Sequence, residues 1–174
     1  QNEGHNIFKY LTSDEYKTVL SEIKQSILAT DLAMFFKNKV IMEKIISTDS
    51  FSWSTIHHRN TLLAVTMTAC DLCAMYKPWD VQQTLVYIIM EEFWEQGDEE
   101  KKRGLTPMQM MDRDKKDDLP TLEVGFIQSI CVPCYELMYT VMPDTKPMLD
   151  GALSNLQRWK ELADDTERER KSQV

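Results

Sequence analysis

Apolar residues recur at three- and four-residue steps along most of the chain, the spacing of helices with one buried face. The first predicted helix begins at Thr12, because Thr12 and Glu15 fit a capping box. Its apolar pattern continues to about Leu32 and is interrupted by Asp31, which is interpreted as a hydrogen-bonded polar contact between packed helices or as a functional residue. A second helical piece is predicted over residues 40–46.

The middle of the chain predicts two helices that lie largely inside the protein. One follows His57 and His58 and ends before Pro78, because proline disfavours a helical residue ahead of it. Successive helical side chains point about 100° apart, so the two histidines are interpreted as a solvated helix start rather than a metal site. The second helix covers residues 79–96, where few polar positions predict burial on most sides.

The last third of the chain predicts a charged loop followed by two helices. Residues 97–118 mix charged side chains with glycine and proline, which is typical of a surface loop. Pro120 starts the next helix in a first-turn position, and Pro133 is expected to kink it. A last amphipathic helix covers residues 146–163, and the charge-alternating residues 164–174 are expected to be frayed or disordered.

Composition favours one fold class and excludes some classes of partner. A chain of 174 residues with 5 Gly and 6 Pro fits one all-α domain, a multi-helix bundle over residues 1–163. The net charge of −8 argues against nucleic acid as a partner, because phosphate binding needs an excess of Lys and Arg. No run of about 18 apolar residues occurs, so no transmembrane segment is predicted and a cytoplasmic location is expected.

Asp71 is the one charged residue in the apolar run 62–76, which predicts that its carboxylate is buried. A buried carboxylate needs a proton, a cationic partner or a metal ion, because an uncompensated charge is strongly disfavoured in the interior. A buried salt bridge, a helix-cap contact and metal ligation would each satisfy this requirement. The residues of the run do not distinguish among them.

Four cysteines form two Cys-x-x-Cys pairs, Cys70 with Cys73 and Cys131 with Cys134. Such spacing occurs in zinc and redox sites. Here each pair lies in an apolar helical pattern, and the gap between the pairs is far longer than is usual for a double zinc motif. Buried, reduced thiols are therefore predicted, with metal or redox chemistry as the alternative.

Six short strings in chain order carry a family resemblance, at residues 27–32, 67–72, 77–79, 92–98, 111–113 and 124–126. Together they resemble the class I cyclic-nucleotide phosphodiesterases, most strongly the members that act on cGMP or on both cyclic nucleotides. The register is colinear over nearly the whole chain. The resemblance implies an all-helical catalytic domain that hydrolyses cAMP or cGMP to the 5′-nucleotide, at a centre of zinc and magnesium or manganese.

The same resemblance implies roles for individual residues. It makes Asp71 a zinc ligand, with carboxylate oxygen as the donor. It also places aromatic and aliphatic side chains around the purine as a flat apolar slot. In this slot Phe126 and Ile89 contact the two faces of the base, Leu72 and Phe93 line the pocket, and Leu32 lies near its mouth. By spacing alone all five are ordinary core residues.

The chain departs from the family pattern in its metal ligands. The other ligands and the histidine that protonates the leaving oxygen belong to an upstream part of the family's catalytic domain, and no residue here matches them. The chain is therefore expected to be the C-terminal part of a catalytic domain in a longer protein, here called the parent protein. Alone it is expected to be inactive, with both metals bound only when the upstream half is present. The resemblance also implies a homodimer of the parent protein. The alternative to an enzyme is a non-catalytic helical binding module derived from the family.

A second departure is Glu123, which stands where the family has a glutamine that hydrogen-bonds the purine. An amide both donates and accepts hydrogen bonds, whereas an ionised carboxylate only accepts. Glu123 is expected to accept from guanine N1–H or adenine N6–H and to repel the neighbouring ring acceptor, which weakens binding unless the carboxyl is protonated. The alternative is a variant side chain that faces solvent.

Overall fold

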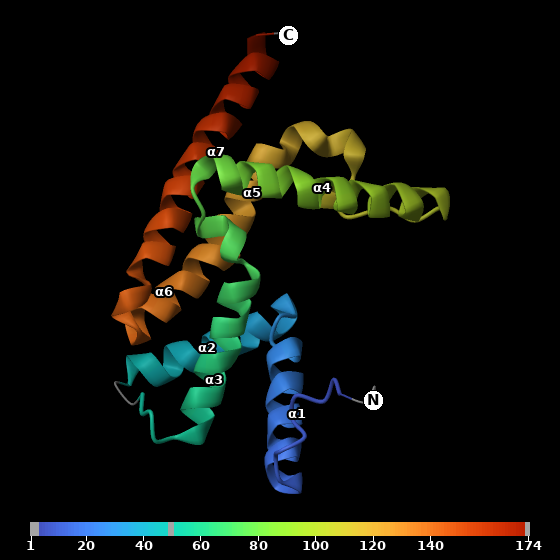
Figure 1. Ribbon diagram of the computed structural model, residues 1–174. Helices are drawn as coiled ribbons and strands as arrows, with labels where there is room; N and C mark the ends of the chain where they lie inside the picture. The colour runs from blue at the N-terminus through green and yellow to red at the C-terminus, as the bar shows by residue number, and fades with distance from the viewer. Residues whose placement is uncertain (1–3, 49–50, 173–174) are drawn as a thin grey trace. The chain divides into compact units, whose positions relative to one another are not determined.

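The computed structural model describes residues 4–48 and 51–172, and within these ranges the chain is helical and forms no strand (Figure 1). This confirms the predicted all-α class. The chain consists of two compact units, Gln1–Cys70 and Asp71–Val174. The prediction of one domain over residues 1–163 stays a prediction.

The first unit contains α1 (Ser13–Leu28), α2 (Leu32–Ser47) and most of α3 (Ile56–Asp71). The predicted capping box at Thr12 is confirmed, since Thr12 and Glu15 exchange side-chain and backbone hydrogen bonds. The predicted extension of this helix to Leu32 is wrong. The Asp31 carboxylate accepts a hydrogen bond from the Ala33 N–H at 2.9 Å, so Asp31 is the N-cap of α2 rather than a contact between packed helices.

Side chains from α2 and α3, with Ala29 after α1, form the core of the first unit. Phe35, Met42 and Val65 are completely buried. The Thr68 hydroxyl donates to the Ala29 carbonyl oxygen at 3.0 Å, which joins α3 to the end of α1. By contrast, α1 itself has no buried residue, and its apolar side chains are exposed at Leu20, Ile23, Ile27 and Leu28.

The start of α3 matches the sequence interpretation in part. His57 is exposed, as expected of a solvated helix start. His58 is half-buried instead, because its Nδ1 accepts a hydrogen bond from the Ser52 N–H at 3.0 Å and its ring stacks on Phe51. His58 therefore has a structural role, and in the described part of the chain neither histidine belongs to a group of three or more potential metal ligands.

The second unit is built around its long last helix. Its α-helices are α4 (Trp79–Lys102), α5 (Leu119–Phe126), α6 (Val132–Val141) and α7 (Lys146–Ser172), with short helical turns at Cys73–Tyr76, Gln109–Met111, Arg113–Asp118 and Pro143–Thr145. Helix α7 packs along α5 and α6 and against the turn Cys73–Tyr76 (Figure 1). A π-helical turn, Ile127–Cys131, joins α5 to α6 immediately before Pro133, so the helix is interrupted where proline predicts it.

The C-terminal residues are ordered as a helix as far as the structure describes them. Helix α7 continues to Ser172, so the prediction of a helix that ends at residue 163 and a frayed tail is wrong over residues 164–172. Intrahelical ion pairs and a contact between Arg170 and Asp118 at 2.8 Å involve this segment. Residues 173 and 174 lie outside the described residues.

Helix α4 buries one stripe rather than most of its surface. Its buried residues are Gln82, Val86, Met90, Trp94 and Gly97, at steps of three or four. The apolar side chains of Val81, Leu85, Ile88 and Ile89 are between 38% and 63% exposed. The prediction of burial on most sides is therefore wrong, because a high apolar count does not show how many faces of a helix have a neighbour.

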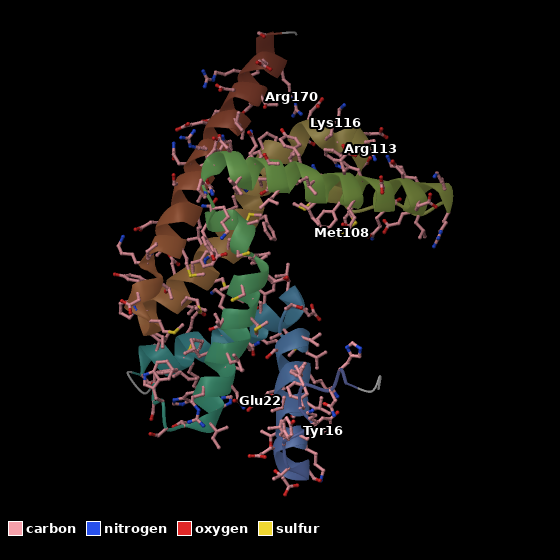
Figure 2. The ribbon with its side chains drawn as sticks, in the orientation of Figure 1. Tyr16, Glu22, Met108, Arg113, Lys116 and Arg170 are labelled. Atoms are coloured by element: carbon pink, nitrogen blue, oxygen red, sulfur yellow. The ribbon has the colours of Figure 1, made fainter. Side chains whose placement is uncertain are left out.

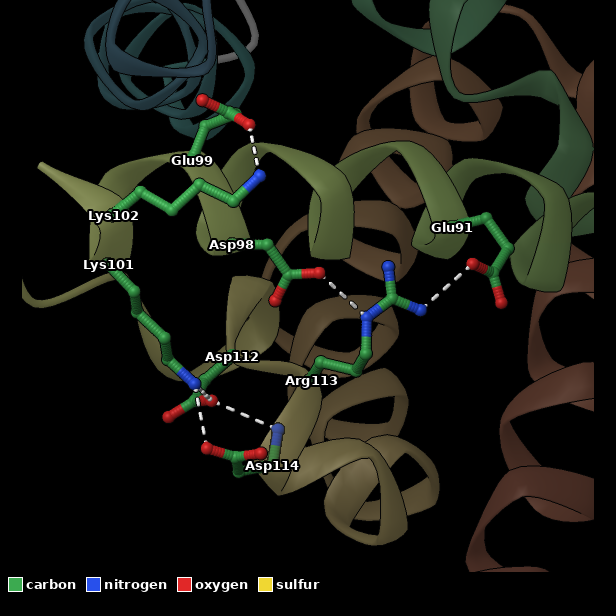
Figure 3. Close-up of polar contacts among 8 residues, drawn as sticks. All are labelled: Glu91, Asp98, Glu99, Lys101, Lys102, Asp112, Arg113 and Asp114. Carbon is green, nitrogen blue, oxygen red and sulfur yellow. Dashed lines mark hydrogen bonds and ion pairs between the residues drawn. The ribbon is translucent and has the colours of Figure 1, made fainter.

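The segment after α4 folds back along that helix and is attached by ion pairs (Figure 3). Arg113 contacts Asp98 at 2.9 Å and Glu91 at 3.1 Å, both on α4. Lys101 pairs with Asp112 and Asp114 on the returning segment. Figure 2 shows Met108 and Arg113 on this segment beside α4. The predicted surface loop thus begins after residue 102 rather than at Gly97 and contains two short helical turns.

Gly97 lets the backbone of the returning segment approach α4 closely. A Cβ atom at Gly97 would overlap the carbonyl oxygen of Met111, a backbone atom that cannot move aside without shifting the segment. We expect Gly97→Ala to lower the free energy of unfolding by about 2 kcal/mol, because overpacking outweighs the better helix propensity of alanine. Urea unfolding followed by circular dichroism measures the change.

Gly125 on α5 provides a matched control for Gly97. No atom lies within 4 Å of a Cβ placed there. Gly125→Ala is therefore expected to raise the free energy of unfolding by about 0.5–1 kcal/mol through helix propensity alone. Equal effects of the two substitutions would contradict the close contact at Met111.

Among the described residues, one helical stretch, Arg113–Val141, is long and apolar enough to cross a membrane by length and composition alone. Several of its side chains belong to the core of the second unit, with Ile127, Cys131 and Tyr135 completely buried. A core helix of a folded protein meets the same criteria. The expectation of no transmembrane segment stays a prediction.

Candidate functional site

Asp71 is the last residue of α3, and its side chain is exposed. The premise of a buried carboxylate is therefore wrong. The apolar run has two faces, with Leu62, Val65 and Ala69 buried and Leu63 exposed on the same helix as Asp71. No hydrogen bond or ion pair joins the Asp71 carboxylate to another side chain in the described part of the chain, so its oxygens are available to a ligand.

The described residues do not form a metal centre by themselves. Over residues 4–48 and 51–172, no group of three or more His, Cys, Asp and Glu side chains is close enough to hold an ion. Asp71 could supply one carboxylate oxygen, which suits zinc or magnesium. A single carboxylate cannot by itself hold the two-metal centre that the resemblance implies.

The cysteines behave mostly as predicted. All four are free thiols, and Cys131 and Cys134 are completely buried. Burial raises the pKa of the Cys131 thiol, which keeps it protonated and unsuited to bind a metal. Cys70 is exposed and Cys73 is half-buried, so the prediction of burial holds for the second pair and is wrong for Cys70.

Glu123 on α5 is the most unusual polar side chain of the second unit. It is only 4% exposed, and its Oε2 is buried without a hydrogen-bond partner among the described residues. Desolvation raises the pKa of its carboxyl from 4.5 to about 7. The alternative that Glu123 faces solvent is therefore wrong. A buried acceptor without a donor is costly to the fold, and a ligand that supplies donors would relieve that cost.

The other predicted pocket residues lie in pairs on two helices. Glu123 and Phe126 are three residues apart on α5, so they share one helical face, and Phe126 is half-buried. Ile89 and Phe93 are four residues apart on α4, with Ile89 40% exposed and Phe93 half-buried. That the two pairs enclose a base stays a prediction.

Leu72 and Leu32 belong to different units. Leu72, in the second unit, is half-buried, and its carbonyl oxygen accepts a hydrogen bond from the Tyr135 hydroxyl at 2.8 Å. This bond fixes the backbone directly after Asp71. Leu32 is half-buried in the first unit, so its expected place at the mouth of the pocket also stays a prediction.

Sequence reasoning missed a buried polar network that supports this part of the second unit. Gln82 is completely buried, its Oε1 accepts from Trp159 Nε1 at 3.0 Å, and its Nε2 donates to Met75 Sδ at 3.6 Å. Asn155 is 2% exposed, and its Nδ2 donates to the carbonyl oxygens of Met75 and Lys77 at 2.9 and 2.8 Å. The available signal was position, since Gln82 lies in the stripe of every fourth residue that α4 buries.

Comparison with known proteins shows which family this chain resembles. A family model described as 3'5'-cyclic nucleotide phosphodiesterase matches residues 1–152. The chain is 45% identical over 165 residues to the probable 3',5'-cyclic phosphodiesterase pde-5 of Caenorhabditis elegans, which covers 95% of this chain and 23% of that protein. It is 42% identical over 163 residues to the dual 3',5'-cyclic-AMP and -GMP phosphodiesterase 11A of Takifugu rubripes, covering 93% of this chain and 18% of that protein.

A third relative is also named as a cyclic-nucleotide phosphodiesterase. The cGMP-specific 3',5'-cyclic phosphodiesterase of Drosophila virilis is 39% identical over 167 residues, covering 95% of this chain and 19% of that protein. The chain therefore spans less than a quarter of the length of each of these relatives. All three are similar to nearly the whole of this chain.

Proposed function

This chain belongs to the 3'5'-cyclic nucleotide phosphodiesterase family, and from that premise we propose that it forms part of a catalytic domain that hydrolyses a 3',5'-cyclic nucleotide to the 5'-nucleotide. The observation that carries the proposal is the family match over residues 1–152, together with relatives that are named as phosphodiesterases of cyclic nucleotides. The chain spans less than a quarter of those relatives, so the activity is proposed for the parent protein.

In this proposal Asp71 contributes one ligand to the metal centre. Its carboxylate is exposed at the end of α3, and the Tyr135 hydroxyl holds the carbonyl of the next residue. The remaining ligands for zinc and for magnesium or manganese would come from residues of the parent protein outside this chain, because the described residues hold no cluster of potential ligands. When bound, the metals would supply the hydroxide that attacks the cyclic phosphate.

The proposed contribution of this chain to the substrate is the base site. Phe126 and Ile89 would contact the two faces of the purine, with Leu72 and Phe93 beside them. Exposed or half-buried apolar side chains on α4 and α5 support this assignment, because a flat base needs apolar surface that the protein core has not already covered. A cytoplasmic location is proposed from the sequence, and a homodimer of the parent is proposed from the family resemblance.

The experiment that tests the proposal compares two carboxylates of the second unit in the parent protein. We expect Asp71→Asn to lower the turnover of cGMP at least about a hundredfold and to lower the bound metal, because a ligand with two acceptor oxygens is replaced by a neutral amide. Asp144→Asn is the matched control, since Asp144 is also exposed and has no ion pair within the described ranges. Its turnover and metal content are expected to equal those of the wild type.

The outcomes separate the alternatives. Because Asp71 is exposed, its substitution is not expected to unfold the protein, and circular dichroism checks this. Unchanged turnover and metal content in Asp71→Asn would contradict its assignment as a ligand. Binding of a cyclic nucleotide by the wild-type parent without any turnover would favour the non-catalytic binding module.

A further inference from the structure

The Glu123 carboxyl is built into the second unit as an acceptor without a donor. Its Oε2 is buried and has no hydrogen-bond partner in the described part of the chain, and the side chain is 4% exposed. Phe126 follows three residues later on the same face of α5 and retains some exposure. An unsatisfied buried acceptor beside a partly exposed aromatic ring is suited to a flat ligand that carries N–H groups on its edge.

The groups around Glu123 do not supply the missing donor. The thiol of Cys131 on the π-helical turn interacts electrostatically with Glu123, and it stays neutral because burial raises its pKa. Tyr135 on α6 donates its hydroxyl to the Leu72 carbonyl. Asp118, five residues before Glu123 in the chain, pairs with Arg170 on α7, so that guanidinium already has a carboxylate partner. Desolvation by burial raises the pKa of the Glu123 carboxyl.

Guanine and adenine present different edges to such a carboxyl. Guanine offers two adjacent donors, N1–H and the N2 amino group, which an ionised carboxylate can accept with its two oxygens. Adenine offers one donor, the N6 amino group, next to the bare acceptor N1. A carboxylate facing adenine makes one hydrogen bond and repels N1, and only the protonated carboxyl can donate to N1.

We infer that Glu123 makes the base site select guanine over adenine, by accepting from guanine N1–H and N2–H when ionised and by requiring a proton before it can pair with adenine. The inference rests on the proposed function, since it takes the ligand of this site to be a cyclic nucleotide. It differs from a glutamine at this position, whose amide can rotate to serve either base without a change of charge.

The selectivity has a predictable pH dependence. With the pKa of free Glu123 near 7, most of the carboxyl is protonated at pH 6 and most is ionised at pH 8. Binding of adenine above neutral pH must include uptake of a proton, so it weakens as the pH rises. Guanine pairs with the ionised form, whose share rises over the same range, so its binding strengthens. The preference for guanine follows the ratio of ionised to protonated carboxyl and is therefore expected to rise by about a hundredfold from pH 6 to pH 8.

The test measures the hydrolysis of cGMP and cAMP in competition, in one reaction with the parent holoenzyme. The ratio of kcat/KM for cGMP to kcat/KM for cAMP, from competition at pH 6, 7 and 8, cancels every titration that affects both substrates equally. We expect the wild-type ratio to rise about a hundredfold over this range and the ratio of Glu123→Gln to be lower at pH 8 and independent of pH. Glu136→Gln, which changes an exposed glutamate on α6, is expected to keep the wild-type slope.

Failure of the inference and failure of the proposed function look different. A wild-type ratio that does not change with pH, or an equal slope in Glu123→Gln, would overturn the role of Glu123 while both nucleotides are still hydrolysed. If neither nucleotide is consumed by either protein at any pH, the proposed function itself is overturned.

Discussion

Asn155→Asp is expected to destabilise the second unit by at least about 3 kcal/mol at pH 7. The Asn155 side chain is 2% exposed, and its amide group donates to two backbone carbonyls, of Met75 and Lys77. Aspartate has the same shape but removes both donors and places a buried charge against two carbonyl oxygens. These carbonyls belong to the connection between Asp71 and α4, so the substitution acts on the backbone that carries the candidate site.

Urea unfolding of the folded chain measures this effect. Gln157→Glu is the matched control, because it makes the same change from amide to acid on an exposed position of α7. There the cost is expected to be at most about 0.5 kcal/mol, from the nearby Glu161 one turn away. An ordinary hydrogen bond contributes about 1 kcal/mol to stability. If the free energy of unfolding of Asn155→Asp lies within about 1 kcal/mol of the wild-type value, the two hydrogen bonds do not support the fold.

The second large effect is the dependence of stability on pH through Glu123. Its carboxyl pKa is about 7 in the folded chain and 4.5 as the ordinary value, so between these values the folded state holds a proton that the unfolded state has lost. Stability from this group is fully present below pH 4.5 and is lost as the pH rises through 7, a loss of about 3 kcal/mol in total.

Glu123→Gln removes this titration and keeps the shape of the side chain. Without nucleotide, the variant is expected to have a free energy of unfolding that exceeds the wild-type value at pH 8 and approaches it below pH 4.5. The difference between the two proteins as a function of pH isolates Glu123 from the other carboxylates, such as Asp112 and Asp118, whose pKa values are lowered by Lys101 and Arg170. A constant difference across the range would mean that Glu123 is not buried as an unpaired acid.

Local signals in the sequence predicted where two helices begin better than they predicted which helix faces are buried and how long the helices are. The Thr12 capping box and the proline at position 120 act through neighbouring residues only, and both were confirmed. The exposed face of α4 and the long α7 were not predicted, because burial and helix length depend on packing partners that a pattern does not name. Asp31 shows the same limit, since a short polar residue fits a packed contact and an N-cap equally well.

For the candidate site, the sequence could predict which positions match the family motifs but not which of their side chains are buried. Asp71 was singled out for the wrong reason, because its surroundings in the sequence are apolar while its own side chain lies on the exposed side of the helix end. Glu123 stood out only through the family resemblance, which marks it as a departure from glutamine, and its burial without a partner is a property of the fold. Asn155 and Gln82 have no sequence signal beyond their spacing from buried apolar residues.

The most direct test is an NMR titration of the Glu123 carboxyl in the parent protein that contains isotope-labelled glutamate. The signal of Glu123 is assigned as the one that disappears in Glu123→Gln. We expect a Glu123 pKa near 7 in the free protein, a lower pKa with a hydrolysis-resistant cGMP analogue bound, and a higher pKa with the corresponding cAMP analogue bound. An identical titration with and without bound nucleotide would contradict the claim that this buried acid contacts the base.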